Sequence, residues 1–228
     1  MQLRVLAAAL TDLVLPADCA GCGAPEPPWC AACAADVGPA RRVGLAGGPE
    51  VLAAGRYTGP LRVAVLRYKE RGRRDLAAPL ATLLAVQLPS APGCPQWLVP
   101  APSRPAAARA RGGDHVLRLC RAVARGSPGD VRVVPVLGLA GRGRDSVGLD
   151  ARERAANLHG RLWVRPRLLP PVGSRVFLVD DVVTTGATLR TCRAALVAAG
   201  VAVHGALVVC DATSTSRRFE TGRPGMES

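Results

Sequence analysis

Two adjacent carboxylates, followed by a loop of hydroxyl and glycine residues, are the side chains of this 228-residue chain best suited to chemistry. Asp180 and Asp181 end the apolar run "RVFLV", and "VVTTGAT" follows them directly. Ligands of open parallel sheets bind beyond the carboxyl ends of the strands. We expect the two acids to accept hydrogen bonds from vicinal hydroxyls, and the loop amides at the next helix start to bind a phosphate. A phosphate one sugar's width from a diol is typical of a ribose 5-phosphate.

The predicted phosphate loop consists of small residues, and Gly186 permits its turn. Its members are Thr184, Thr185, Gly186, Ala187 and Thr188. Other common phosphate loops fit poorly, because the chain has neither Gly-x-x-x-x-Gly-Lys-Ser/Thr nor Gly-x-Gly-x-x-Gly after a strand. The alternative, in which the acids only cap a turn, is weaker because adjacent buried acids repel each other unless something uses them.

Four of the eight cysteines are clustered near the N-terminus and predict a metal module. Cys19, Cys22, Cys30 and Cys33 form two Cys-x-x-Cys pairs, separated by seven residues, in "CAGCGAPEPPWCAAC". This spacing is typical of a closed, structural Zn²⁺ site with four thiolate ligands. Two redox-active pairs or disulfides are the alternatives. Of the remaining cysteines, Cys120, Cys192 and Cys210 are expected to be buried thiols.

Composition points to partners that carry phosphate. The net charge is +13, and the basic residues are almost all Arg, with Lys69 the only lysine. Codon bias explains the Arg excess, and a position that keeps Lys is therefore singled out. No apolar run reaches the length of about 18 residues that a membrane span needs. The opening "MQLRVLAAALTDLVLP" is interrupted by Thr11 and Asp12, so we expect an amphipathic first helix rather than a signal peptide, and a cytoplasmic protein.

The elements that must position these residues alternate between strand and helix from Val51 onward. The pattern predicts a strand, a turn at Gly59-Pro60, and two helices around a basic loop. The buried strand "QWLVPAP", the basic loop "SRPAAARARGGD", the helix "HVLRLCRAVARG" and the strand "VRVVPVLG" follow. The strand "RVFLVDD", a helix and a last strand complete the series. Strands that are apolar on both faces predict an α/β fold with a mostly parallel sheet flanked by helices.

Three parts of the chain are expected. Residues 1–45 form an N-terminal helix and a small zinc module with four cysteine ligands, followed by a Gly- and Pro-rich linker into residues 46–213, the α/β domain. Residues 214–228 form a polar tail that is expected to be disordered.

The motifs resemble a known family. "VFLVDDVVTTGAT" is similar to the phosphoribosyl-pyrophosphate motif of type I phosphoribosyltransferases. The cysteine module, "YTGPLRVAVLRYKERGRRDLA", "LVPAPSRPAAARARGGD" and "RERAANLHGRLWV" resemble the ComF (competence protein F) family in order and spacing, from about residue 10 to 211. The resemblance implies a zinc module on a type I phosphoribosyltransferase-like fold, phosphoribosyl pyrophosphate or a nucleotide as ligand, Mg²⁺, and a link to DNA uptake.

The resemblance also implies roles for individual residues. Asp180 and Asp181 match the pair that contacts the ribose hydroxyls, and Ser103 and Arg104 match the start of the pyrophosphate-side loop. Lys69 matches the lysine of the family, and residues 142–154 match a mobile hood. The chain departs from the family at two places. The usual Arg-Gly-Phe-Asn is Arg-Gly-Gly-Asp at residues 111–114, and the glutamine of the hood is replaced near Ser146-Val147. These departures imply that base recognition is altered or that no base is recognised.

Two functions follow as hypotheses. The first is a phosphoribosyltransferase that transfers phosphoribose to a nitrogenous base, with Asp180, Asp181, Lys69 and Arg104 as catalytic residues and no protein nucleophile. The alternative is a non-catalytic competence factor that handles single-stranded DNA together with competence or helicase proteins. The chain has only seven aromatic residues on which bases can stack, which counts against a strong single-strand platform. The sequence specifies neither the acceptor base nor an oligomeric state.

Overall fold

A twisted six-stranded sheet forms the centre of the molecule. The computed structural model describes residues 18–26, 28–91, 93–140 and 162–213. The strand order is β1 (Arg41–Val43), β2 (Val51–Arg56), β8 (Val203–Asp211), β7 (Arg175–Val183), β3 (Gln96–Pro100) and β4 (Val131–Val133). Only β1 is antiparallel to its neighbour, and the other strands of this sheet are parallel. The predicted α/β class with a mostly parallel sheet is therefore confirmed.

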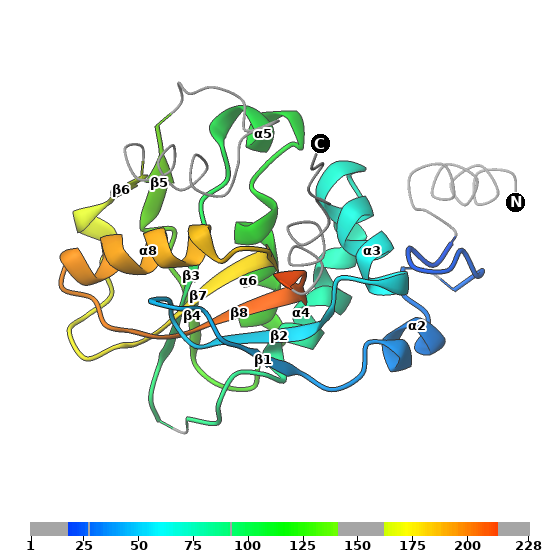
Figure 1. Ribbon diagram of the computed structural model, residues 1–228, viewed down its shortest axis with the longest axis horizontal. Coiled ribbons are helices and arrows are strands. Elements are labelled where there is room, and N and C mark those ends of the chain that lie inside the picture. Colours follow the sequence, from blue (N-terminus) through cyan, green and yellow to red (C-terminus); the bar gives the residue numbers. More distant parts are fainter. Residues whose placement is uncertain (1–17, 27, 92, 141–161, 214–228) are drawn as a thin grey trace, which may run out of the picture.

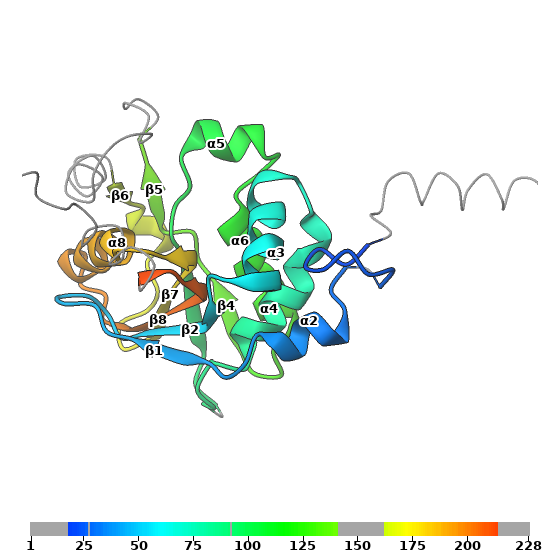
Figure 2. The ribbon, with the colours of Figure 1, turned by 45° about the vertical axis from the view of Figure 1, so that its right-hand side comes forward.

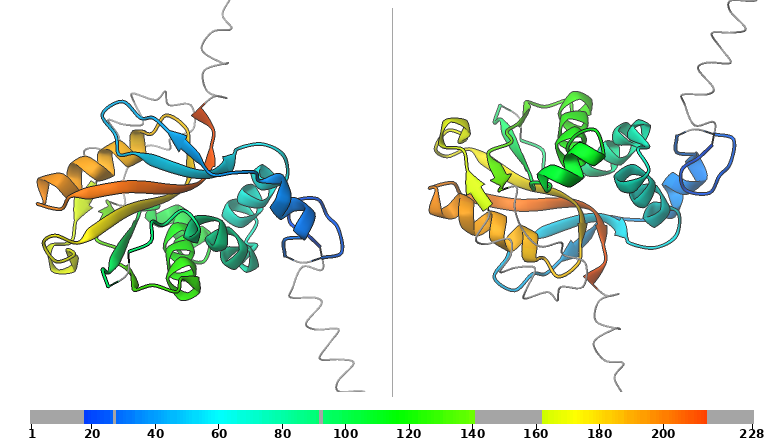
Figure 3. Two further views of the ribbon diagram at one scale, coloured as in Figure 1. Left: turned by 90° about the horizontal axis from the view of Figure 1, so that it is seen from below. Right: turned by 90° about the horizontal axis from the view of Figure 1, so that it is seen from above.

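Helices cover both faces of the sheet (Figure 1; Figure 3). On one face lie α3 (Gly59–Glu70), α4 (Ala77–Ala85) and α6 (His115–Gly126), and the turn η1 (Arg74–Leu76) joins the first two. On the other face lies α8 (Ala187–Ala198), beside the small two-stranded sheet of β5 (Leu137–Leu139) and β6 (Leu162–Val164), which the turn η2 (Pro166–Leu168) follows. The two aliphatic cores, with Leu80 and Leu119 on one side and Leu189 and Leu196 on the other, are almost fully buried. Each such leucine contributes about 1.5–3 kcal/mol by leaving water.

The structure differs from the sequence prediction at three elements. The predicted basic loop contains the helix α5 (Pro105–Ala110), because Pro105 is suited to the first turn of a helix and alanines follow it. The predicted strand "VRVVPVLG" is two strands in different sheets, with Pro135 between them. The predicted linker contains β1, whose Val43 pairs with Val51 of β2.

The cysteine module packs against α3 at one end of the molecule (Figure 2). It contains the short helix α2 (Ala31–Asp36). Ala20, between the first two cysteines, is fully buried in the core cluster that α3 shares with α4 and α6. Asp18 forms ion pairs with Arg67 of α3 (3.0 Å) and with Arg73 (2.9 Å). The module is therefore joined to the α/β domain by both apolar burial and charge.

The predicted N-terminal helix, hood and C-terminal tail lie outside the described residues. Within the described ranges, no helix combines the length and the apolar character that crossing a bilayer requires.

Candidate functional site

The two acids lie where β7 extends beyond its neighbour β3. The last paired residues are Pro100 and Val179, and the amide of Ala101 donates to the Val179 carbonyl at 2.8 Å. Beyond this point the amide of Asp181 donates to Asp180 Oδ1 (2.8 Å), and the amide of Val182 donates to Asp181 Oδ1 (2.7 Å). Each carboxylate thus accepts from the backbone amide that follows it, which fixes both side chains at the carboxyl end of β7.

Asp180 shares a cavity with the predicted phosphate loop. The cavity measures about 270 Å³ and is lined by Asp180, Arg104 and residues 182–189, with Pro102 and Leu139 at its margin. Gly186 precedes α8 with a φ of 72°, a backbone conformation that favours glycine. Among the described residues, no protein group accepts a hydrogen bond from the amides of Thr184, Thr185, Gly186 and Thr188. These donors and the start of α8 are suited to bind an anion.

Asp180 differs from an ordinary surface carboxyl in its protonation. Burial, and next the charge of Asp181, raise the pKa of Asp180 to about 8, although Lys69 acts in the opposite direction. At neutral pH the group therefore keeps its proton in most molecules, and about one molecule in ten carries the charge. A carboxyl in this state can donate or accept a proton without a large free-energy cost.

Asp181 faces a second, adjoining hollow of about 570 Å³. Its Oδ2 lies 2.7 Å from Lys69 Nζ on α3 and 2.9 Å from His115 Nε2 on α6. Burial alone would raise the pKa of Asp181, but the hydrogen bond from His115 and the charge of Lys69 hold this pKa well below its usual range. Burial alone would lower the pKa of Lys69, but Asp181 raises it above its ordinary value. Asp181 and Lys69 therefore form an ion pair in which the carboxylate is buried and the lysine is half-buried.

The structure brings the predicted site residues together around these two cavities. Ser103, Lys69 and both acids line the second hollow, and Arg104, Thr184 and Thr188 line both. Successive residues of a strand point to opposite faces of the sheet. Asp181 therefore reaches α3 and α6, whereas Asp180 lines the cavity before α8.

His115 is a site residue that sequence reasoning missed. Its only local signal is its place as the first residue of a helix, directly after the capping residue Asp114. Its contact with Asp181 spans 66 positions, and sequence periodicity does not reveal contacts of this kind.

The four predicted metal ligands converge on one point. The sulfur atoms of Cys19, Cys22, Cys30 and Cys33 all lie within 4.8 Å of one another. The distances of 3.7 Å between Cys19 and Cys33, and of 3.6 Å between Cys22 and Cys30, fit a tetrahedron of thiolates about one ion. A Cβ at Gly21 would lie 2.7 Å from the Cys33 sulfur, so this glycine allows the close approach. The cluster can hold a metal ion.

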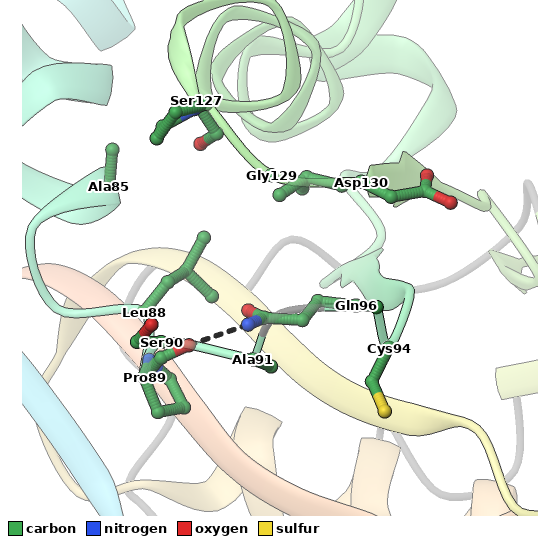
Figure 4. A pocket seen from close by; sticks show the side chains of 13 residues that line it. Ala85, Leu88, Pro89, Ser90, Ala91, Cys94, Gln96, Ser127, Gly129 and Asp130 are labelled. Carbon is green, nitrogen blue, oxygen red and sulfur yellow. Dashed lines mark hydrogen bonds between the residues drawn. The ribbon is translucent and has the colours of Figure 1, made fainter.

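A further hollow, of about 610 Å³, lies at the amino-terminal ends of the strands, opposite the two acids. Figure 4 shows the residues that line it. It is lined by the first residues of β3 and β4 and by the turns before them. Asp130 is its one charged lining residue, and Arg132 pairs with that carboxylate at 2.8 Å. Since this hollow has neither the acid pair nor the loop amides, the carboxyl edge is the candidate site.

Comparisons with known proteins give a partial match in sequence. No protein-family model matches the chain. The chain is 31% identical over 118 residues to an orotate phosphoribosyltransferase of Acidithiobacillus ferrooxidans, in a match that covers 46% of this chain and 58% of the relative. The chain thus spans less than two thirds of that relative's length. The matched part of the sequence is similar to a phosphoribosyltransferase, and the ComF resemblance stays a prediction.

Solved structures give more remote likenesses. A hypoxanthine phosphoribosyltransferase from Trypanosoma cruzi aligns with a TM-score of 0.35 and 18% identity, over 70% of this chain and 74% of that one. A hypoxanthine phosphoribosyltransferase from Staphylococcus aureus aligns with a TM-score of 0.35 and 15% identity, over 63% of this chain and 65% of the other. Scores of this size carry no further conclusion.

Proposed function

We propose that the chain is a phosphoribosyltransferase, which binds phosphoribosyl pyrophosphate with Mg²⁺ and transfers phosphoribose to a nitrogenous base. One observation carries the proposal: Asp180 lines the same cavity as the amides of Thr184, Thr185, Gly186 and Thr188, which have no acceptor among the described residues. The relationship in sequence to an orotate phosphoribosyltransferase supports it.

In the proposed reaction the bond between the anomeric carbon and the pyrophosphate oxygen breaks, and pyrophosphate leaves with the electron pair. A nitrogen of the base forms the new bond to that carbon and loses a proton. Mg²⁺, when bound with the donor, supplies charge that stabilises the departing pyrophosphate.

The residues of the chain bind and orient the donor in this scheme. The amides of residues 184–188 hold the 5-phosphate, Asp180 accepts hydrogen bonds from the ribose hydroxyls, and Arg104 faces the leaving group. Lys69 adds positive charge to the adjoining hollow. Asp180, with a pKa raised to about 8, is suited to take the proton of the base.

The cysteine module has a structural role in the same proposal. Zn²⁺ prefers four thiolates in a closed tetrahedron, as the convergence of the four sulfurs provides. The four ligands would leave no open coordination position for a substrate, so the ion would stabilise the fold of the module.

The alternative role in handling single-stranded DNA stays a prediction. Three exposed arginines lie beside the hollow that Asp181 faces. Arg109 is on α5, and Arg71 and Arg74 are in the segment that follows α3. Arg74 donates to the carbonyl of Arg111 at 3.2 Å, so these segments lie together. A cationic rim of this kind attracts pyrophosphate as well as a nucleic-acid backbone. We favour the smaller ligand because the cavity with Asp180 accounts for a sugar as well as for phosphate.

Isothermal titration calorimetry with phosphoribosyl pyrophosphate and Mg²⁺ tests the proposal. At pH 9, where Asp180 carries its charge, we expect the wild type to bind and Asp180→Asn to bind at least about tenfold more weakly, since a hydrogen bond to a charged group is worth about 1.5–3 kcal/mol. Asp130→Asn, at the opposite edge of the sheet, is the matched control and should bind like the wild type. No heat from the wild type, together with heat from a single-stranded oligonucleotide, would support the alternative instead.

A further inference from the structure

The first turn of α6 contacts the loop after β3, the strand β7 and the helix α3. Asp114 caps this helix, because its Oδ1 accepts from the amide of Leu117 at 3.0 Å. Its other oxygen accepts from the amide of Ser103 at 3.2 Å. The loop after β3, which carries Ser103, is therefore held by the helix start.

His115 continues this connection with its side chain. The ring is almost completely buried, with 4% of the residue exposed. Nδ1 lies 3.4 Å from Ser103 Oγ, and Nε2 lies 2.9 Å from Asp181 Oδ2. The backbone is also fixed, since the Tyr68 hydroxyl donates to the His115 carbonyl at 2.7 Å. Both ring nitrogens thus have partners, one in the loop after β3 and one on β7.

The contacts of the two acids differ in a way that affects ligand binding. Asp181 Oδ2 contacts both Lys69 and His115, and its Oδ1 accepts from the Val182 amide. A carboxylate has about four lone-pair sites, so protein groups occupy most of those on Asp181. Asp180 accepts at Oδ1 from the Asp181 amide, and within the described part of the chain neither Lys69 nor His115 forms an ion pair or hydrogen bond with it.

We propose that His115 is a positioning residue of the phosphoribosyl site. Its Nε2 holds the Asp181 carboxylate against Lys69 and its Nδ1 holds Ser103, so that Asp180 alone meets the sugar. This inference rests on the proposed function. It assigns the two neighbouring acids different roles, one in orienting Lys69 and the loop after β3, and the other in contact with the ligand.

The first experiment reads the histidine directly and needs no ligand. The chain has only three histidines, so ¹⁵N-labelled imidazole spectra can be assigned by substitution. We expect Asp181→Asn to shift the Nε2 signal of His115, and Ser103→Ala to shift its Nδ1 signal. The Nδ1 of His204, at the opposite edge, accepts from the amide of Val176, and neither variant should move its signals. Unchanged His115 signals in both variants would overturn the inference.

The second experiment uses matched substitutions at position 115. His115→Gln can place an amide N–H near the position of Nε2 and should bind phosphoribosyl pyrophosphate and Mg²⁺ within about threefold of wild type. His115→Leu removes both polar contacts and should bind about tenfold more weakly, as expected for the loss of a hydrogen bond to a charged group. His204→Gln is the control, with wild-type affinity.

The outcomes separate this inference from the proposed function. Wild-type binding by His115→Leu, or equal losses in the Gln and Leu variants, would overturn the positioning role. Absence of binding by the wild type would overturn the proposed function, and the imidazole spectra would still decide whether His115 holds Asp181.

Discussion

Asp180 and Asp181 are neighbours in the chain, but their carboxylates have opposite electrostatic surroundings. Asp181 contacts Lys69 and His115, which stabilise its charge. Burial and the charge of Asp181 both disfavour the ionised form of Asp180 and so raise its pKa. Groups whose pKa values are pushed apart in this way often divide acid, base and binding roles. The sequence predicted the pair as a unit, although the period of two in a strand already implies that adjacent side chains point to different faces.

The raised pKa of Asp180 predicts a pH-dependent stability difference between the wild type and Asp180→Asn. Between a pKa near 3.9 in the unfolded chain and about 8 in the folded one, only the folded state keeps the proton. Raising the pH through this window therefore lowers the free energy of unfolding of the wild type, and the amide is immune to this loss. We expect Asp180→Asn to gain about 2 kcal/mol or more relative to the wild type between pH 5 and pH 8.

Urea unfolding of both proteins at pH 5, 6.5 and 8 measures this difference. Asp130→Asn, an exposed carboxyl at the other edge, should keep a constant offset from the wild type. If the free energies of unfolding of Asp180→Asn and of the wild type change in parallel with pH, then Asp180 titrates as an ordinary carboxyl.

At the scale of elements, the turn before α8 depends on a contact from a distant hairpin. Leu45, between β1 and β2, lies 2.5 Å from where a Cβ at Gly186 would be. The hairpin therefore packs directly behind the predicted phosphate loop. Gly186 is required for two reasons, its positive φ and this close approach, whereas the sequence indicated only the first.

Gly186→Ala and Gly200→Ala separate these two causes. Gly200 has a φ of 80° with open space around it, so its substitution isolates the conformational cost of about 1 kcal/mol. We expect Gly186→Ala to cost up to about 1 kcal/mol more, because the contacting atoms belong to the end of the Leu45 side chain, and Leu45→Ala to restore part of this loss in the double variant. Chemical denaturation of the two single glycine variants, the Leu45→Ala variant and the double variant measures it. Equal losses in the two glycine variants would show that Leu45 does not support the loop.

The predicted bounds of helices and strands agree best with the structure where a single sequence signal indicates the element. The central strands β7 and β8 each contain an uninterrupted apolar run, "VFLV" and "ALVVC", and α6 begins and ends at its predicted residues. The prediction failed where local signals conflicted: the arginines and glycines of residues 103–114 hid the Ala-rich helix α5 behind Pro105. Strand β1 is three residues long, and only its pairing with β2 defines it. The long-range contact of His115 with Asp181 has no local signal at all.

In the whole molecule, the candidate site and the cysteine module both contact the helix α3. Lys69, which pairs with Asp181, is two residues from Arg67, which pairs with Asp18 beside the first cysteine. Arg73, which is 8% exposed, contacts both Asp18 and Asp75. A buried charge that loses one partner is costly, so the end of α3 depends on the module for part of its stability.

Loss of the proposed Zn²⁺ is therefore expected to affect the α/β domain as well as the module. Cys19→Ser should abolish binding of Zn²⁺ and release Ala20 and Asp18 from α3, because a module this short folds only with its ion. A loss of about 2 kcal/mol would lower Tm by about 4–8 °C in a chain of this size. Cys94→Ser changes an exposed cysteine outside the cluster and should leave both Tm and metal content unchanged. Metal analysis and thermal unfolding of the two variants decide the matter: if Cys19→Ser loses its Zn²⁺ but melts like the wild type, the module contributes nothing to the stability of the domain that carries Lys69.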